Sequence, residues 1–279
     1  MQIGFLTGPF HGQDLESVVH FAAGAGFQCL EIATGPGSRH LDPLKLDDSR
    51  ATAIRKSFDS AGLQISSLAN YMNILHPDPA EQERLSGVLR STIDAAHKLG
   101  VDIVCTMAGM PLPGKSRMQT IEEAVPGAFT PLCEYAAKLG IKLALENWFE
   151  TNIQNLEHWE RIFALVPNDN FGLNFDPSHL VHQGIDYMAA VERFGPRIFH
   201  THAKDTEINQ QRLARVGNRG GGWWRYVIPG LGEIHWGRYV GALRRVGFKG
   251  AVSIEHEDST FSPEEGMKIG LANLKLTVI

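Results

Sequence analysis

The sequence predicts an α/β fold, a (β/α)8 TIM barrel formed by a single domain over residues 1–279. Three observations lead to this prediction. The length of 279 residues suits one barrel domain. Hydrophobic residues make up 43% of the chain and charged residues 20%, the balance of an ordinary globular protein. A short pattern, in which a helix-like stretch passes through a glycine into an apolar run, recurs along the chain.

The recurring pattern marks the passage from a helix to the next strand. It occurs as AGAGFQCLEIA, DSAGLQISSLA, HKLGVDIVCTM, AKLGIKLALEN and RRVGFKGAVSIEHE. The glycines of the first four copies, Gly26, Gly62, Gly100 and Gly140, are 36, 38 and 40 residues apart. Glycine just after a helix adopts the left-handed conformation at little cost. The interval before Gly247 holds two further units, VPNDNFGLNFD and ERFGPRIFHTH, and a first strand, IGFLTG, precedes them all.

Helices are expected between these strands. Apolar residues at helical spacing predict a helix over 81–99, and Asp47, or Asp48 with Ser49, predicts the start of an earlier one. Alternating strands and helices give a parallel sheet, and eight even units close most economically as a barrel. The alternative, an open doubly wound sheet, is less favoured because no GxGxxG motif follows the first strand.

One region departs from the repeat. Residues 203–236, after the seventh strand, are rich in glycine and show no clear period. We expect a long irregular loop there, on the face where barrel active sites lie, serving as a functional loop or lid. A passive surface excursion is the alternative, but it would leave Trp223 and Trp224 exposed without a purpose.

Composition excludes several classes of protein. The chain has 26 Lys+Arg against 31 Asp+Glu, a net charge of −5, so neither nucleic acid nor an anionic membrane is an expected partner. Cys29, Cys105 and Cys133 are too few and too widely spaced for a disulfide framework or a zinc knuckle. No apolar run is long enough to span a membrane, and the start of the chain lacks a secretion signal. We therefore expect a cytoplasmic protein.

Acidic residues and histidines end four consecutive predicted strands. Glu146 ends the fifth strand, Asp176 the sixth, and Glu255 the eighth, while His202 lies near the end of the seventh. The carboxyl ends of barrel strands meet at one rim, where unpaired carboxylates would repel one another. A divalent cation resolves this repulsion. Three carboxylates and one imidazole favour Mn²⁺ or Mg²⁺, although such a site also accepts Co²⁺ and, less typically, Zn²⁺.

These residues carry a resemblance to a known family. The segments LALEN, NFDPSH, HTHAKD and SIE, in this order and spacing, resemble the xylose isomerase-like TIM barrel superfamily, and within it the D-tagatose/D-psicose 3-epimerases and inosose isomerases. The resemblance implies metal ligation by Glu146, Asp176, His202 and Glu255. It also implies that Glu146 and Glu255 are the acid/base pair and that His179 contacts a substrate oxygen.

The chain departs from the ketose 3-epimerases at one position. Those enzymes have an arginine six residues after the seventh-strand histidine, and this chain has Ile208. The substitution weakens the expectation of a ketohexose substrate more than the expectation of the chemistry. Glu31, which we expect at the end of the second strand, either contacts substrate or bonds to a neighbouring loop.

Three further residues are candidates for substrate binding. His200 points the same way as the histidine two residues later but one layer deeper, and a hydrogen-bonded core histidine is the alternative. Lys204 stabilises an oxyanion or pairs with Asp205 or Glu207. Trp148 forms a wall of the pocket against sugar C–H surfaces or packs within its own loop.

The predicted function is that of a divalent-metal-dependent isomerase or epimerase of a sugar, keto-sugar or cyclitol, acting through a metal-stabilised enediolate. A keto-inositol dehydratase and a 3-keto-glycoside lyase or epimerase are alternatives on the same barrel. An endonuclease IV-like DNA repair enzyme is less favoured because it needs additional ligands and a basic face. A barrel that only binds sugar would be expected to have lost some of the ligands. A small-molecule substrate is the expected partner, and the resemblance also allows a homo-oligomer.

Overall fold

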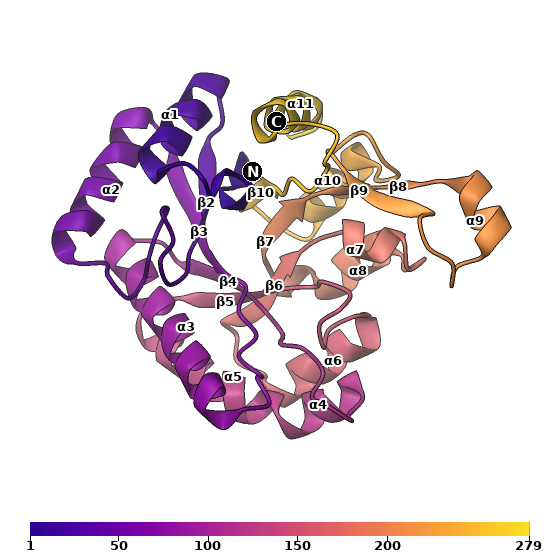
Figure 1. The fold of residues 1–279 in the computed structure, drawn as a ribbon, viewed down its shortest axis with the longest axis horizontal. Helices are drawn as coiled ribbons and strands as arrows, with labels where there is room; N and C mark the ends of the chain where they lie inside the picture. Colours follow the sequence, from indigo (N-terminus) through magenta and orange to yellow (C-terminus); the bar gives the residue numbers. More distant parts are fainter. Residues whose placement is uncertain (279) are drawn as a thin grey trace.

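A closed barrel of parallel strands lies at the centre of the molecule (Figure 1). The computed structural model describes residues 1–278, and in this range eight strands close in the order β1-β10-β7-β6-β5-β4-β3-β2. The barrel strands are β1 (Gln2–Leu6), β2 (Cys29–Ala33), β3 (Gln64–Asn70), β4 (Ile103–Met107), β5 (Lys142–Glu146), β6 (Phe171–Phe175), β7 (Ile198–Ala203) and β10 (Ala251–Ile254). The predicted (β/α)8 barrel is confirmed.

Helices surround the barrel and connect its strands. They are α1 (Leu15–Ala25), α2 (Asp48–Ala61), α3 (Pro79–Leu99), α4 (Arg117–Glu123), α5 (Val125–Lys138), α6 (Leu156–Leu165), α7 (Ser178–Val181), α8 (Tyr187–Phe194), α9 (Gln210–Val216), α10 (Trp236–Arg245) and α11 (Pro263–Leu274), with short 3-10 turns η1 (Gly8–Phe10) and η2 (Gly195–Arg197). Within residues 1–278, none of these helices is both long and apolar enough to cross a membrane.

The ends of the helices follow the predicted signals. The side chain of Asp47 accepts a hydrogen bond from the Arg50 amide and so caps the start of α2. Gly62 and Gly100 follow α2 and α3 with φ of 67° and 72°, the left-handed conformation that turns the chain toward the next strand. The helix predicted over 81–99 starts two residues earlier, at Pro79.

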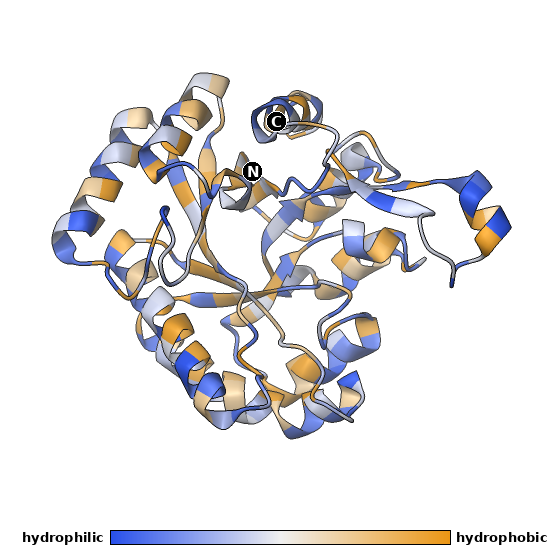
Figure 2. Ribbon diagram, in the orientation of Figure 1, coloured by the Kyte–Doolittle hydropathy of each residue, from blue (hydrophilic) through white to orange (hydrophobic). Residues whose placement is uncertain are grey.

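The apolar core lies mainly between the barrel and the helices. Figure 2 shows that the helices carry both hydrophobic and hydrophilic residues, as expected when one side of a helix packs on the sheet. A second, smaller apolar cluster fills part of the barrel interior and includes Leu6, Cys105 and Ala144. Other interior positions hold buried polar side chains, among them Glu31, Asn174 and His200, which lie beneath the site.

The segment predicted as an irregular loop is partly ordered, so the prediction for residues 203–236 needs correction. It begins with an antiparallel hairpin of β8 (Asp205–Ile208) and β9 (Trp224–Val227). The hairpin pairs Asp205 with Val227 and Ile208 with Trp224, and α9 lies at its far end (Figure 1). Each strand has only four residues, so neither stands out beside the glycine-rich stretch between them.

Candidate active site

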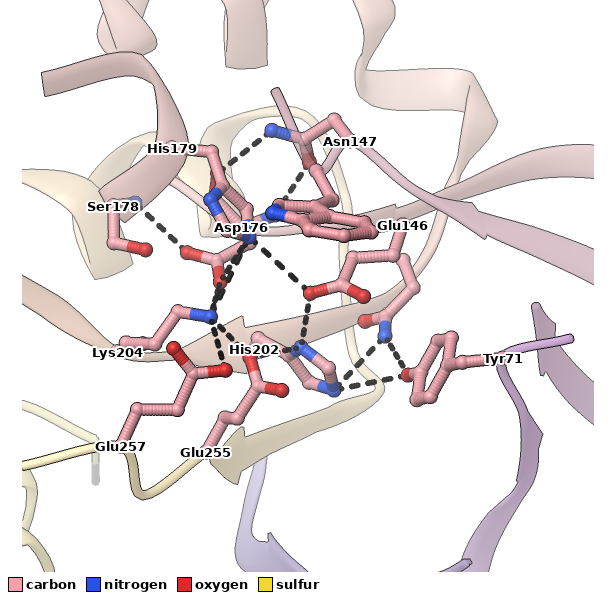
Figure 3. A network of polar contacts seen from close by, with 12 residues as sticks. Tyr71, Glu146, Asn147, Asp176, Ser178, His179, His202, Lys204, Glu255 and Glu257 are labelled. Atoms are coloured by element: carbon pink, nitrogen blue, oxygen red, sulfur yellow. Dashed lines mark hydrogen bonds and ion pairs between the residues drawn. The ribbon is translucent and has the colours of Figure 1, made fainter. Parts of the chain in front are cut away.

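The carboxyl ends of four neighbouring barrel strands bring the predicted residues together (Figure 3). Glu146 is the last residue of β5, Asp176 directly follows β6, and Glu255 directly follows β10. His202 lies in β7, and Lys204 follows the same strand. All five residues are buried, with 0–9% of their surface exposed. The side chains predicted as ligands therefore lie together at one rim of the barrel, and their role as a site stays a prediction.

One compact group in this site has the ligand chemistry of a metal centre. Ligand atoms of Glu146, Asp176, His179 and Glu255 all lie within 4.8 Å of one another. The buried Oδ2 atom of Asp176 accepts no hydrogen bond, although Lys204 Nζ lies 3.3 Å from it. Three carboxylates and an imidazole so close together fit a divalent cation. This group contains His179, for which the resemblance implied a contact with substrate. It does not contain His202, the histidine of β7 that the resemblance implied as a ligand.

His202 also faces the carboxylates. Its Nδ1 atom lies 3.3 Å from Glu146 Oε1 and 3.1 Å from Glu255 Oε2, while its Nε2 atom lies 3.0 Å from Glu31 Oε2. Burial disfavours the charged imidazolium, but the carboxylates of Glu255 and Glu31 outweigh that effect and raise the pKa of His202 well above its usual value. Two imidazoles thus flank the carboxylates from different sides.

Lys204 places a buried ammonium group among the acidic side chains. Its Nζ atom lies 2.6 Å from Glu255 Oε2, 3.3 Å from Asp176 Oδ2 and 3.5 Å from Glu257 Oε1, and 4.4 Å from the centre of the Tyr226 ring. Burial opposes the charge, yet the neighbouring carboxylates raise the pKa of Lys204 well above its usual value. The ammonium therefore offsets part of the negative charge of the site.

The alternative pairing of Lys204 with Asp205 or Glu207 is wrong. Asp205 accepts hydrogen bonds from the backbone and a side chain of residues 230–236, and so anchors the segment that leads into α10. Glu207 pairs with Arg225, which also contacts Asp258. Arg225 thus forms ion pairs with Glu207 and Asp258, neither of which belongs to the predicted ligand set.

The two predicted acid/base residues are ionised. Burial raises the pKa of both carboxyls, but the cationic side chains around them outweigh it. Hydrogen bonds from His179 and His202 hold the pKa of Glu146 well below its usual value, and Lys204 and His202 lower the pKa of Glu255. Both side chains are therefore bases at neutral pH.

His179 is held by a residue that the sequence analysis missed. Its Nδ1 atom lies 2.6 Å from the hydroxyl of Tyr226 in β9, and its Nε2 atom lies 3.3 Å from Glu146 Oε1. Tyr226 lies in the hairpin that the sequence analysis treated as irregular, and a strand prediction there was the signal that would have found it.

Aromatic side chains pack together beside the site. Trp148 is half-buried, and its ring contacts Phe149 at 6.4 Å between centroids. Phe149 in turn contacts His182 and Trp224, which stack on each other at 4.0 Å. Trp148 thus packs within its own loop, as the alternative interpretation expected. Its contact with substrate stays a prediction.

A polar network fills the barrel beneath the carboxylates. Glu31 does not end its strand, as the sequence suggested, but lies in the middle of β2, where Tyr71 and Ser253 donate hydrogen bonds to its carboxylate. His200 is fully buried, with Asn174 2.9 Å from its Nδ1 atom. These contacts favour the alternative interpretation of His200 as a hydrogen-bonded core histidine.

A second group of ligand-type atoms belongs to this network. Ligand atoms of Glu31, Cys105 and His200 lie within 4.8 Å of one another. Burial, with the charge of Glu31, raises the pKa of the Cys105 thiol well above its usual value, so that group remains protonated. Because Glu31 and His200 are already hydrogen bonded, we assign this group a structural role.

Comparison with known proteins agrees with the fold. The family model described as xylose isomerase-like TIM barrel matches residues 19–277. This chain belongs to that family. Among the curated relatives, a Bacillus subtilis protein named YfiH is 27% identical over 317 residues, covering 100% of this chain and 99% of the relative. An inosose isomerase of the same organism is 27% identical over 179 residues, covering 63% of this chain and 59% of the relative.

Solved structures share the fold of the xylose isomerase-like family at lower sequence identity. The IolI protein with a bound zinc atom superimposes with a TM-score of 0.78 at 20% identity, covering 100% of this chain and 98% of the other. D-psicose 3-epimerase in the presence of D-fructose superimposes with a TM-score of 0.75 at 17% identity, covering 100% and 99%. The proteins to which this chain is similar thus include one named as an isomerase and one named as an epimerase.

Proposed function

We propose that this protein is a divalent-metal-dependent isomerase or epimerase of a sugar, keto-sugar or cyclitol that acts through an enediolate. The observation that carries the proposal is the pair of buried, ionised glutamates, Glu146 and Glu255. Both lie next to one imidazole nitrogen, His202 Nδ1, at 3.3 and 3.1 Å. Two bases around one point are what proton removal and return require.

Glu146, Asp176, His202 and Glu255 would hold the cation, with His179 as a second imidazole beside them. Mn²⁺ or Mg²⁺ suits this oxygen-rich set, and the zinc in the similar IolI structure supports Zn²⁺ as a further candidate. When bound, the cation acts as a Lewis acid that stabilises negative charge on the substrate oxygens.

The side chains of the protein perform the proton transfers. One of Glu146 and Glu255 removes the proton from the carbon next to the carbonyl, and the other returns it. Return to the opposite face of the same carbon gives epimerisation, whereas return to the neighbouring carbon gives isomerisation. The ammonium of Lys204 lies 2.6 Å from Glu255 and the ring of His179 lies 3.3 Å from Glu146, so both are placed to orient substrate oxygens by hydrogen bonds.

Deuterium exchange in D₂O tests this proposal. The Mn²⁺-loaded protein is incubated with ketohexoses, inososes and 3-keto-glucosides, and carbon-bound deuterium is measured by NMR. We expect exchange at a carbon next to the carbonyl, lost with EDTA and reduced at least about 100-fold in Glu255→Gln because general-base catalysis contributes that much.

The half-exposed Glu257 offers a matched control two residues further along the chain. Glu257→Gln is expected to retain exchange within a few-fold. Absence of exchange on every substrate, with the cation demonstrably bound, would contradict the proposal.

A keto-inositol dehydratase is the second candidate, favoured by the names of several relatives. An inosose dehydratase of Clostridium botulinum is 23% identical over 260 residues, covering 87% of this chain and 82% of the relative. The first step is the same, but the loss of a neighbouring hydroxyl follows. An unsaturated ketone in the same NMR spectra would distinguish dehydration from isomerisation.

A further inference from the structure

Asp176 lies just beyond the hydrogen bonds that join two strands of the barrel. The ladder between β5 and β6 ends with the pair Glu146 and Asn174, and β6 itself ends at Phe175. The backbone amide and carbonyl of Asp176, a fully buried residue, therefore need partners from outside this ladder. The contacts that supply them also decide where the Asp176 carboxylate points.

Asn147 supplies both partners. It directly follows β5, and its Oδ1 atom accepts a hydrogen bond from the Asp176 amide at 2.7 Å. Its Nδ2 atom donates to the Asp176 carbonyl oxygen at 2.8 Å (Figure 3). A backbone amide only donates and a backbone carbonyl only accepts, so the orientation of the Asn147 side chain is fixed. Asn147 has no exposed surface, and its side-chain amide takes the place of one further residue in the ladder.

The carboxylate of Asp176 is oriented by a further contact. Its Oδ1 atom accepts a hydrogen bond from the backbone amide of Ser178, the first residue of α7, at 2.8 Å. Its Oδ2 atom accepts no hydrogen bond and lies 3.3 Å from Lys204 Nζ and 3.4 Å from His179 Nε2. One oxygen of the carboxylate is thus engaged by the backbone, and the other faces the site.

We propose that Asn147 is a positioning residue: by holding both backbone groups of Asp176, it directs Asp176 Oδ2 to the cation of the proposed site. This inference rests on the proposed function, because it concerns the same cation site. A ligand that is already held in place binds more tightly, since ordering a mobile carboxylate costs conformational entropy. Loss of a hydrogen-bond partner that orients a ligand weakens cation binding about 10- to 100-fold.

Asn147→Ala removes both hydrogen bonds to Asp176 and leaves every predicted ligand in the chain. Asn170→Ala is the matched control. Asn170 directly precedes β6, at the opposite end of that strand from Asp176, and its Nδ2 atom donates to the carbonyl oxygens of Cys133 and Ile141 at 2.9 and 3.0 Å. Each variant therefore loses two hydrogen bonds between a side-chain amide and the backbone. Mn²⁺ affinity is measured by calorimetry for the wild type and both variants, and melting temperatures are measured in EDTA.

We expect both variants to melt below the wild type, because each loses hydrogen bonds of the same kind. Mn²⁺ binding is expected to be about 10- to 100-fold weaker in Asn147→Ala and to change by less than about 3-fold in Asn170→Ala. An affinity that is unchanged in a folded Asn147→Ala variant, or lowered equally in both variants, would overturn this inference alone. A wild-type protein that binds no divalent cation would overturn both this inference and the proposed function.

A second measurement uses the wild-type protein and does not depend on the folding of any variant. In a crystal structure of the Mn²⁺-loaded chain, the cation is located by its anomalous scattering. We expect Asp176 to contact it through Oδ2, with both hydrogen bonds between Asn147 and the Asp176 backbone retained. Contact through Oδ1, or loss of those hydrogen bonds while Mn²⁺ is bound, would overturn the inference alone. Mn²⁺ bound only outside this site would overturn the proposed function as well.

Discussion

At the scale of single residues, Lys204 has an unusual position for a lysine. Its ammonium has no exposed surface and lies against the carboxylates of Asp176 and Glu255, with Glu257 nearby. A charge removed from water is tolerated only when oppositely charged partners are in place, and the carboxylates in turn depend on it. Lys204 therefore contributes to the integrity of the site as well as to any contact with substrate.

Lys204→Met tests this mutual dependence. Breaking a buried ion pair by removing one partner costs about 3–5 kcal/mol, so we expect a loss of that size in the free energy of unfolding in EDTA. Mn²⁺ should restore part of it, because a bound cation offsets the same carboxylates. Urea denaturation with and without Mn²⁺ gives both values.

The exposed Lys249 provides the control for this measurement. Lys249→Met is expected to change the free energy of unfolding by no more than about 0.5 kcal/mol. Equal stability of both variants in EDTA would show that the Lys204 ammonium is not needed by the carboxylates.

At the scale of elements, the hairpin of β8 and β9 depends on aromatic contacts for its position beside the barrel. Two-stranded hairpins are marginally stable alone. Here Trp224 stacks on His182 with an interplanar angle of 6°, and Tyr226 reaches His179. The pKa of His182 is lowered to about 4, mainly by burial, so the stacked ring is neutral.

Trp224→Ala is expected to loosen the hairpin without unfolding the barrel. Amide hydrogen exchange over residues 205–227 should become at least about 10-fold faster, while the barrel strands keep their protection, because local opening then costs less free energy. Exchange followed by mass spectrometry measures this. Leu231→Ala, at a side chain 45% exposed, is the control. Unchanged exchange in the hairpin would mean that the stack does not anchor it.

At the scale of the whole molecule, the polar barrel interior makes stability depend on pH. Burial is the main cause that lowers the pKa of His200 to about 4. The folded state therefore favours the neutral ring, while the unfolded chain takes up a proton near pH 6.5. This contribution is fully present above about pH 6.5 and is lost as the pH falls toward 4, by about 3 kcal/mol at most.

Melting temperatures between pH 4 and 8 in EDTA measure this effect. We expect the wild type to lose stability over that window and His200→Asn, which has no titrating ring at this position, to lose less. The Glu31 carboxyl, whose pKa is lowered to about 2 because His202 and His200 outweigh the effect of burial, stabilises the folded state fully above about pH 4.5 and loses that contribution only below this pH. Identical pH profiles for the two proteins would contradict the assignment to His200.

Sequence reasoning predicted the repeated part of this molecule better than its interruptions. The glycines after the helices and the acidic ends of the strands recur in register, so the barrel and the location of Glu146 and Glu255 followed from them. Tyr226 could not be recognised because its role depends on a short hairpin that folds back onto His179. The hydrogen bonds of Glu31 were equally hidden, because its partners lie on strands far apart in the sequence.

The glycine corners described above have a consequence for the order of the chain. Gly62 and Gly100 lie before the amino ends of β3 and β4, so they are at the opposite end of the barrel from the carboxylates. The candidate reacting groups lie at one end of the barrel, and these helix-to-strand turns lie at the other. The order of the units along the chain therefore has little influence on the reaction. A circularly permuted chain opened at such a corner would present the same rim from a different first unit.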